Sequence, residues 1–227
     1  MRKLQRPDFS LLVKWLDKNL KAVTQAGLVL CLALVSVAYI RLFNPEAFES
    51  AFSPASRPLP VYNVETEEKK VAISFDAAWG EEKTDEILKI LKDHDVHTTF
   101  FLVGYWVDKY PDHVKQIADA GHEIGNHSYD HRRLTKLNEA GVRSQVSRCE
   151  EALASLGEYR PHLLRPPEGA MNATVRRVAR AEGYRLILWD IDTRDWAHTP
   201  PDTITRNVLE SVQAGDIILM HDYIGHD

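Results

Sequence analysis

The amino-acid sequence predicts an α/β fold with a largely parallel sheet. After residue 70, short apolar runs of strand composition alternate with segments of helical periodicity, which is the pattern of this fold class. The chain has 227 residues, of which 44% are hydrophobic and 27% charged, and this composition suits one globular domain with attachments. Its formal net charge of −5 provides no broad basic surface, so nucleic acid is not an expected partner.

Six runs have the composition of strands, and helices are expected between them. The runs are residues 71–75, 98–103, 122–125, 162–164, 185–189 and 216–220. One helix is expected over residues 84–92, where Ile87, Leu88 and Leu91 form an apolar stripe.

Two further helices are marked by residues that favour helix ends. Asn138 can cap a helix at its start, and Asn172 and Gly183 bracket another, with the glycine suited to a left-handed C-terminal turn. The predicted buried face of the helix after Asn138 consists of Val142, Val146, Cys149, Leu153 and Leu156.

The N-terminal region contains an uncharged apolar segment, residues 22–40, whose length is close to that which spans a bilayer. We therefore predict a single-pass transmembrane anchor over residues 22–42, preceded by a basic tail over residues 1–21. The charged residues of the tail are Arg2, Lys3, Arg6, Lys14, Lys18 and Lys21, with Asp8 and Asp17. By the positive-inside rule the tail is cytoplasmic, and the rest of the chain lies outside the cell membrane.

Two other interpretations of the apolar segment stay open. A buried core helix is disfavoured, because the segment is apolar on all sides. A cleavable signal peptide could use the small residues Ser36 and Ala38, although the stretch before the apolar run is long for a signal peptide.

Residues 43–69 form a predicted spacer, because several prolines lie there among serine, glutamate and alanine. The folded domain is expected over residues 70–227. Cys149 lies in this domain and Cys31 in the apolar span, so the two cannot pair within one chain. No internal disulfide is therefore expected.

Reactive side chains follow several of the predicted strands. They are Asp76, His127, Arg165, Asp192 and His221. Because the carboxyl ends of parallel strands meet at one edge of an α/β fold, we expect these side chains to converge on a ligand-binding mouth. Each residue taken singly is more often a helix cap or a core residue, but the five together favour a functional site.

His127 and His131 are four residues apart. On one helical turn their imidazoles would point the same way and could bind one cation. Two histidines alone are weak evidence for a metal site, since such a pair is more often explained by surface or core histidines.

Five motifs in order resemble the polysaccharide deacetylases, a carbohydrate esterase family that shares the NodB-homology domain. The motifs are SFD at 74–76, HSYDH at 127–131, RPPEG at 165–169, DTRDW at 192–196 and LMHD at 219–222. The stretches TTFFLVG at 98–104 and AGHEIGNHS at 120–128 are similar to its sporulation-associated branch. The resemblance implies a distorted (β/α) barrel of about seven strands. It also implies metal-assisted hydrolysis of N-acetyl groups on an amino-sugar polymer.

The resemblance further implies roles for the acid and base of the reaction. Asp76 would take a proton from a metal-held water, and His221 would return a proton to the leaving amine. Arg165 would keep Asp76 ionised, and the carboxylate of Asp192 or Asp195 would in turn hold Arg165 in place.

The family also implies a metal and a substrate pocket. His127 and His131 would bind a divalent metal, with zinc or cobalt as the expected ion. Leu219 and Trp196 would shape a small apolar pocket for the acetyl methyl. A backbone N–H near Glu168 would help to stabilise the oxyanion.

The chain departs from the family pattern in three places. Ala77 stands where the family commonly has a second, metal-binding aspartate, which predicts weak metal binding or a substitute donor such as Asp76. Glu168 replaces a frequent aromatic residue and so removes a possible sugar-stacking surface. The chain stops at Asp227, where the family usually continues with another helix and strand, which predicts a barrel truncated at its C-terminus.

Three functions are compatible with these observations. The first is an anchored deacetylase that acts on peptidoglycan, a chitin-like polymer or another N-acetylated glycan of the cell envelope. The second is a glycan-binding or sporulation protein that keeps the cleft but has weak or no turnover. The third is a metal-dependent O-acetyl esterase. We take the first as the leading hypothesis, and metal content and the relative turnover of amides and esters separate the three.

Overall fold

The computed structural model describes residues 10–43 and 59–223 of the chain. The chain divides into two compact units, one ending at Arg57 and the other beginning at Pro58. The first unit contains one long helix, α1 (Ser10–Phe43). Its part from Lys18 to Phe43 is long and apolar enough to cross a membrane and is not buried within the protein. Because a signal sequence has the same properties, the anchor and its orientation stay predictions.

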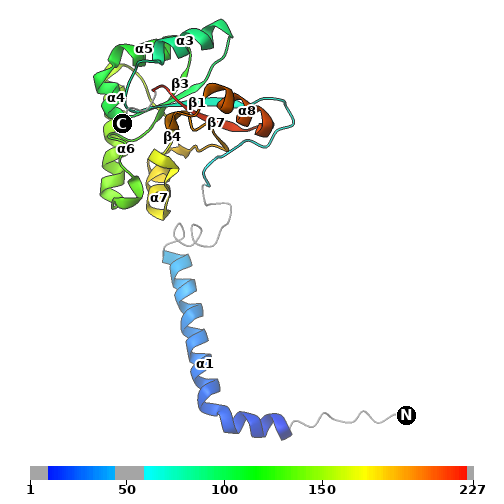
Figure 1. Cartoon of the computed structure of the whole chain (residues 1–227). Helices are drawn as coiled ribbons and strands as arrows, with labels where there is room; N and C mark the ends of the chain where they lie inside the picture. Colours follow the sequence, from blue (N-terminus) through cyan, green and yellow to red (C-terminus); the bar gives the residue numbers. More distant parts are fainter. Residues whose placement is uncertain (1–9, 44–58, 224–227) are drawn as a thin grey trace. The chain divides into compact units, whose positions relative to one another are not determined.

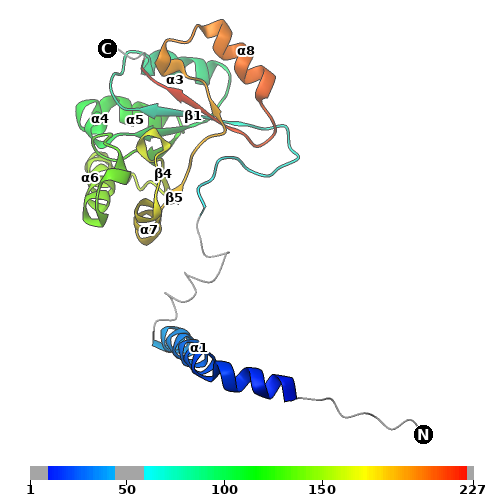
Figure 2. The same cartoon turned by 60° about the horizontal axis from the view of Figure 1, so that its bottom comes forward.

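The second unit is built on seven parallel strands. These are β1 (Ala72–Ala77), β2 (Thr99–Leu102), β3 (Glu123–Asn126), β4 (Leu163–Leu164), β5 (Arg185–Leu186), β6 (Ile191–Asp192) and β7 (Ile217–His221). The order in the sheet is β5-β4-β3-β2-β1-β7-β6, and each neighbouring pair is parallel. The predicted parallel α/β fold is therefore confirmed (Figures 1 and 2).

The connection between β5 and β6 shows that the sheet curls into a half-barrel. These strands form opposite edges of the sheet, and flat edges of seven strands would lie about 29 Å apart at the usual spacing. The chain passes from Leu186 to Ile191, a stretch that spans at most about 18 Å when extended. The two edges must therefore approach each other, which confirms the expected distorted barrel of about seven strands.

A segment before β1 lies along the gap between these edges. Val61 forms a parallel bridge with Ile187, and Asn63 forms an antiparallel bridge with Asp216. The N–H of Val61 donates to the carbonyl of Leu186 at 2.9 Å. The last part of the predicted spacer therefore packs with the folded unit, while residues 44–58 lie outside the described region.

Helices connect the strands and surround the sheet in Figures 1 and 2. They are α3 (Thr84–Asp93), α4 (Gly104–Lys109), α5 (Pro111–Asp119), α6 (Glu139–Leu156), α7 (Ala173–Ala181) and α8 (Pro201–Ser211). Both predicted N-caps are confirmed, because Asn138 accepts from Gly141 N–H and Asn172 accepts from Val175 N–H, each at 2.9 Å. Gly183 has a φ of 78°, the left-handed conformation expected at this helix end.

The two faces of β1 carry different side chains. Phe75 and Ala77 belong to the apolar core that includes residues of α3 and α4. Ser74 and Asp76 alternate with them and contact Arg165. The strand therefore separates an apolar core from a polar interior, and the functional site is built in that interior.

Candidate active site

Asp76 and Arg165 form a buried ion pair at the centre of the site. Asp76 lies one residue before the end of β1, and Arg165 follows β4 directly. Arg165 Nη1 donates to Asp76 Oδ1 at 2.7 Å. Burial alone would raise the pKa of Asp76, but the Arg165 guanidinium is the main group that holds this pKa below its ordinary value. Asp76 is therefore ionised at neutral pH.

The other contacts of the Arg165 guanidinium are with neutral groups. Nη2 donates to Ser74 Oγ at 2.8 Å and to the Leu188 carbonyl at 3.2 Å. The guanidinium carbon lies 4.0 Å from the centre of the Phe101 ring. Because these partners carry no charge, the positive charge of Arg165 acts on Asp76.

His127 follows β3, and its imidazole is completely buried. Nδ1 lies 2.6 Å from the Arg165 carbonyl oxygen, which can only accept, so Nδ1 carries the proton. Burial lowers the pKa of His127, although Asp76 opposes this effect, and the ring is neutral. Nε2 is therefore an acceptor, and it has no hydrogen-bond partner among the described residues.

The Nε2 atom of His127 lies 3.3 Å from Asp76 Oδ2. Both atoms are acceptors, so their proximity calls for a positive charge between or beside them. Two donors about 2.0–2.1 Å from one tetrahedral ion lie about 3.3–3.4 Å apart. This pair of atoms therefore fits a divalent cation.

His131 lies beside His127, but the predicted helical turn is wrong. Residues 127–131 form a non-helical turn in which Ser128 and His131 have φ values of 67° and 59°. The ring centres of His127 and His131 are 5.1 Å apart, so the two imidazoles lie close together although the backbone between them is not helical. Burial is the main cause that lowers the pKa of His131 to about 4, and its ring is neutral.

Two polar side chains that sequence reasoning missed hold this turn. Asn126 Oδ1 accepts from Ser128 N–H at 2.9 Å. Gln145 Oε1, on α6, accepts from the N–H groups of Tyr129 and Asp130 at 3.2 Å each. The asparagine two residues before a serine is a local signal for such a turn, whereas Gln145 is too distant in sequence to give one.

The donor set fits a cation but lacks a dedicated third ligand. Within residues 10–43 and 59–223, no three histidine, cysteine or acidic side chains are grouped as metal ligands. Ala77 is completely buried and offers no donor atom. The two donor atoms that lie close together are His127 Nε2 and Asp76 Oδ2, with the His131 imidazole beside them.

Asp195 holds His221, the last residue of β7. Asp195 Oδ1 lies 2.8 Å from His221 Nδ1, and Oδ2 accepts from the His221 backbone N–H at 2.7 Å. Since a carboxylate accepts, Nδ1 carries the proton and Nε2 is the atom that can exchange one. Burial would lower the pKa of His221, but Asp195 and Asp76 outweigh it and raise this pKa.

The acidic partner of Arg165 in the structure differs from the predicted one, which was Asp192 or Asp195. The acidic partner of Arg165 in the described contacts is Asp76, and Asp195 contacts His221 instead. Asp192 is exposed and its Oδ1 accepts from the backbone N–H of Arg194. The physical reason is position: Asp195 lies in a short turn after β6, which pairs with β7 and so brings the turn beside His221.

A cavity of about 400 Å³ opens onto these groups. It is lined by Asp76, His131, Glu168, Trp189, Asp192, Trp196, Leu219, His221 and Tyr223. The predicted pocket residues Glu168, Trp196 and Leu219 therefore share one cavity with the predicted base and acid. Trp189 and Tyr223 were missed, because neither follows a pattern that distinguishes it from a core aromatic.

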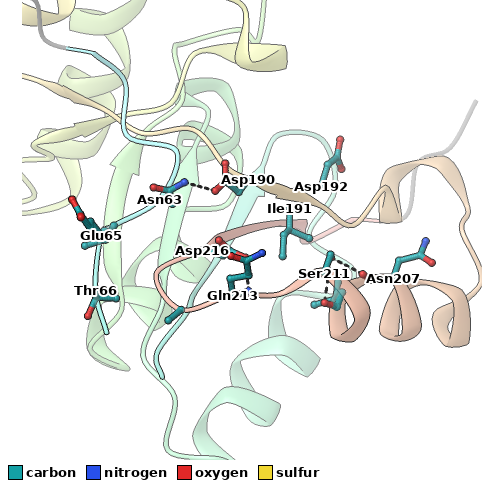
Figure 3. A pocket seen from close by; sticks show the side chains of 13 residues that line it. Asn63, Glu65, Thr66, Asp190, Ile191, Asp192, Asn207, Ser211, Gln213 and Asp216 are labelled. Atoms are coloured by element: carbon teal, nitrogen blue, oxygen red, sulfur yellow. Dashed lines mark hydrogen bonds between the residues drawn. The ribbon is translucent and has the colours of Figure 1, made fainter. Parts of the chain in front are cut away.

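A second cavity, of about 780 Å³, is lined by residues 63–66, by β6 and the residue before it, by α8 and by the loop after α8. Figure 3 shows acidic and amide side chains on its wall, among them Asp190, Asp192 and Asp216. Its lining includes Asp192 but no other residue of the predicted site. The chemistry expected from the sequence therefore belongs to the smaller cavity.

The half-barrel brings its strand-end residues to one cavity, and comparison with known proteins identifies the family. A family model described as polysaccharide deacetylase matches residues 63–187. A peptidoglycan-N-acetylglucosamine deacetylase of Bacillus cereus is 42% identical over 156 residues, which cover 69% of this chain and 57% of the relative. The chain belongs to the polysaccharide deacetylase family, which confirms the resemblance read from its motifs.

Solved structures show the same fold with different activities. A peptidoglycan N-acetylglucosamine deacetylase bound to a hydroxamate-type benzamide ligand has a TM-score of 0.72 and 38% identity, covering 77% of this chain and 81% of that one. A pseudoenzyme of carbohydrate esterase family 4 from Bacillus anthracis has a TM-score of 0.71 and 34% identity, covering 73% and 59%. A mutant described as the same pseudoenzyme with restored activity also has a TM-score of 0.71. The chain spans 57% and 52% of two curated relatives that it matches.

Proposed function

We propose that this chain hydrolyses N-acetyl groups on an amino-sugar polymer of the cell envelope. The observation that supports this most is that Asp76, ionised beside Arg165, and His221, held by Asp195, line the same cavity. Relatives named as peptidoglycan deacetylases make peptidoglycan the leading substrate class, with a chitin-like polymer as the alternative.

Asp76 and His221 are suited to two different proton transfers of the reaction. Asp76 Oδ2 would take a proton from the attacking water, because its other oxygen is bound by Arg165. His221 Nε2 would give a proton to the leaving nitrogen, and its raised pKa keeps that proton available near neutral pH. Separate groups allow both transfers without movement of either side chain.

A divalent cation, zinc or cobalt by family expectation, would when bound lower the pKa of water and polarise the acetyl carbonyl. His127 Nε2 and His131 would hold it, with Asp76 Oδ2 as the acidic donor among the described residues. Asp76 Oδ2 would then have to serve as both ligand and base. We therefore expect weaker metal binding and slower turnover than in a site with a second aspartate at position 77.

The remaining cavity residues would position the acetamido group. Leu219 and Trp196 would contact its methyl, because both present apolar surface on the wall of the cavity that also holds Asp76 and His221. The amide of Glu168 is the candidate oxyanion donor, since the N–H groups of Gly169 and Ala170 already bond to backbone carbonyls. Glu168 has a φ of 58°, and its side chain pairs with Arg133 at 3.4 Å.

The proposal includes attachment to the cell membrane. Residues 1–21 would be a cytoplasmic tail, 22–42 the anchor, 43–69 a spacer whose last part packs with the folded unit, and 70–227 the catalytic domain outside the membrane. The apolar part of α1 and the preceding basic residues support this arrangement.

A second candidate function is glycan binding with weak or no turnover. Ala77 favours it, because the described donor set lacks the family's second aspartate. The likeness to a structure described as a pseudoenzyme favours it as well.

Three substrates test the proposal and separate its alternatives. The full chain in detergent is incubated with chitotetraose, with N-acetylated peptidoglycan fragments and with 4-nitrophenyl acetate, each with zinc or cobalt. Release of acetate with an equal amount of free amine from a glycan supports the deacetylase. Turnover of the ester alone supports an O-acetyl esterase. Glycan binding without any acetate supports the second candidate, and Asp76→Asn serves as the background in every case.

A further inference from the structure

Trp79 places a half-exposed indole beside the catalytic cavity. It follows β1 by two residues and is 52% exposed, whereas Trp106 is completely buried. Its ring centre lies 5.4 Å from that of His131, with the ring planes 66° apart. Since His131 lines the cavity, the indole borders the cavity wall and still exposes about half of its surface to solvent.

The loop that carries Trp79 is held by buried contacts before and after it. Ala77 and Ala78 belong to the apolar core, and the Ala77 carbonyl accepts from Val103 N–H at 3.0 Å. The Gly80 carbonyl accepts from Trp106 Nε1–H at 2.8 Å. The indole is therefore presented on a fixed backbone, which limits the entropy lost when a ligand binds to it.

The chemistry around Trp79 suits an uncharged sugar ring. The face of an indole is negative and attracts the weakly positive C–H groups on one face of a pyranose. The neighbouring cavity wall carries the carboxylates of Asp76, Glu168 and Asp192, which disfavour an anionic ligand. An acyl chain would have to desolvate the three carboxylates and the two imidazoles of this wall without offering them hydrogen bonds.

We propose that Trp79 stacks on the sugar unit next to the one whose acetamido group lies in the cavity. Trp79 borders the cavity through His131 but is not one of its lining residues, so it is placed for a neighbouring unit. The chain would then recognise oligomers of N-acetylated amino sugars better than monomers. The choice of glycan rests on the proposed deacetylase function, whereas the stacking itself does not require turnover.

The test measures how binding depends on oligomer length. Calorimetry with the full chain in a detergent without sugar groups, and with a chelator to prevent turnover, gives affinities for N-acetylglucosamine and chitotetraose. Trp79→Ala removes the indole, Trp79→Leu keeps apolar volume without a ring, and Trp79→Phe keeps a ring. Tyr62→Ala is the matched control, because Tyr62 is also about half exposed but lies in the segment before β1, outside the cavity.

We expect Trp79→Ala and Trp79→Leu to weaken chitotetraose binding about tenfold while changing monomer binding less than twofold. Trp79→Phe keeps most of the affinity, and Tyr62→Ala changes neither ligand. Equal losses for monomer and tetramer overturn the proposal, as does no loss for either. A thermal melt identifies any variant that does not fold. If Trp79→Ala does not fold, the difference in chitotetraose affinity between Trp79→Phe and Trp79→Leu tests the proposal.

The same samples distinguish this inference from the proposed function. If chitotetraose binding depends on Trp79 but no acetate appears with added metal, the deacetylase proposal fails and the stacking proposal stands. If acetate is released and binding does not depend on Trp79, the stacking proposal fails alone.

Discussion

Arg165 Nη1 and Asp76 Oδ1 lie 2.7 Å apart, and the two side chains are 0% and 5% exposed. A buried carboxylate is costly unless a positive charge compensates it. The pair therefore links the stability of the half-barrel to the ionised state of the proposed base.

Replacing Arg165 by methionine should destabilise the folded domain by about 3–5 kcal/mol, because it leaves Asp76 buried without a partner. Equilibrium unfolding in urea, followed by tryptophan fluorescence, measures the loss. Arg133→Met is the matched control: Arg133 is half exposed and pairs with Glu168 at 3.4 Å, so its loss should cost no more than about 1 kcal/mol. Equal effects of the two changes would show that the buried pair has no special role in stability.

His131 should make the metal-free domain less stable in mild acid. Its pKa falls from the ordinary 6.5 to about 4, so the unfolded chain binds a proton at a higher pH than the folded chain. The stability that this residue contributes is complete above pH 6.5 and is lost as the pH falls toward 4, by at most about 1.4 kcal/mol per pH unit. Unfolding free energies at several pH values, with a chelator present, measure the slope.

His131→Gln should remove this part of the slope, because glutamine does not titrate in the range. His162→Gln, at an exposed histidine outside the cavity, controls for the loss of any histidine. If both variants keep the slope of the parent chain, the pKa of His131 is not lowered in the folded domain.

Asp195→Asn should lower the pKa of His221. The change removes the carboxylate that contacts both Nδ1 and the backbone N–H of His221. An NMR titration of the histidine ring protons, assigned with a His221→Ala variant, measures the shift. Asp192→Asn also removes one nearby charge but makes no direct contact with His221, so it should shift the pKa less. A larger shift from Asp192→Asn would mean that Asp195 is not the main carboxylate acting on His221.

Loss of either imidazole of the proposed cation site should weaken metal binding. We expect His127→Ala and His131→Ala each to lower the metal affinity by more than the about 10-fold to 100-fold that follows removal of an outer-shell partner. Calorimetry with zinc and cobalt gives the affinities, and folding is checked by circular dichroism. His122→Ala is the control, because His122 is also buried but does not line the cavity. Unchanged affinity in both site variants would place the metal elsewhere.

The sequence predicted the position of the site better than its contacts. Asp76, His127, Arg165 and His221 lie at strand ends, and the convergence of parallel strands at one edge brings them together without further information. The turn at His131 depends on hydrogen bonds from Gln145 on α6, so local spacing suggested a helix where none forms.

The contact of Asp195 with His221 depends on β6, a strand of two residues at the sheet edge. So short a strand has no alternation that a sequence pattern can detect. The sequence therefore placed Asp195 among the predicted site residues with Arg165 as its partner, whereas its contact in the structure is with His221.

Ala77 ends β1 on the side of the apolar core, and Ala77→Asp tests whether a carboxylate at this position can turn to the proposed cation site. Ala77 is completely buried, so Ala77→Asp should destabilise the metal-free domain by adding a second carboxylate next to Asp76. A divalent metal should reverse this loss if residue 77 faces His127 and His131. Equal destabilisation with and without metal would mean that residue 77 faces only the apolar core.

The most direct measurement is acetate release from chitotetraose and peptidoglycan fragments as a function of zinc or cobalt concentration, for the parent chain, Ala77→Asp and Asp76→Asn. We expect that the parent chain releases acetate when metal is added, that Ala77→Asp does so at lower metal concentration, and that Asp76→Asn releases none. If Ala77→Asp releases acetate and the parent chain releases none at any metal concentration, the natural chain binds glycan without hydrolysing it, and the proposed function is wrong.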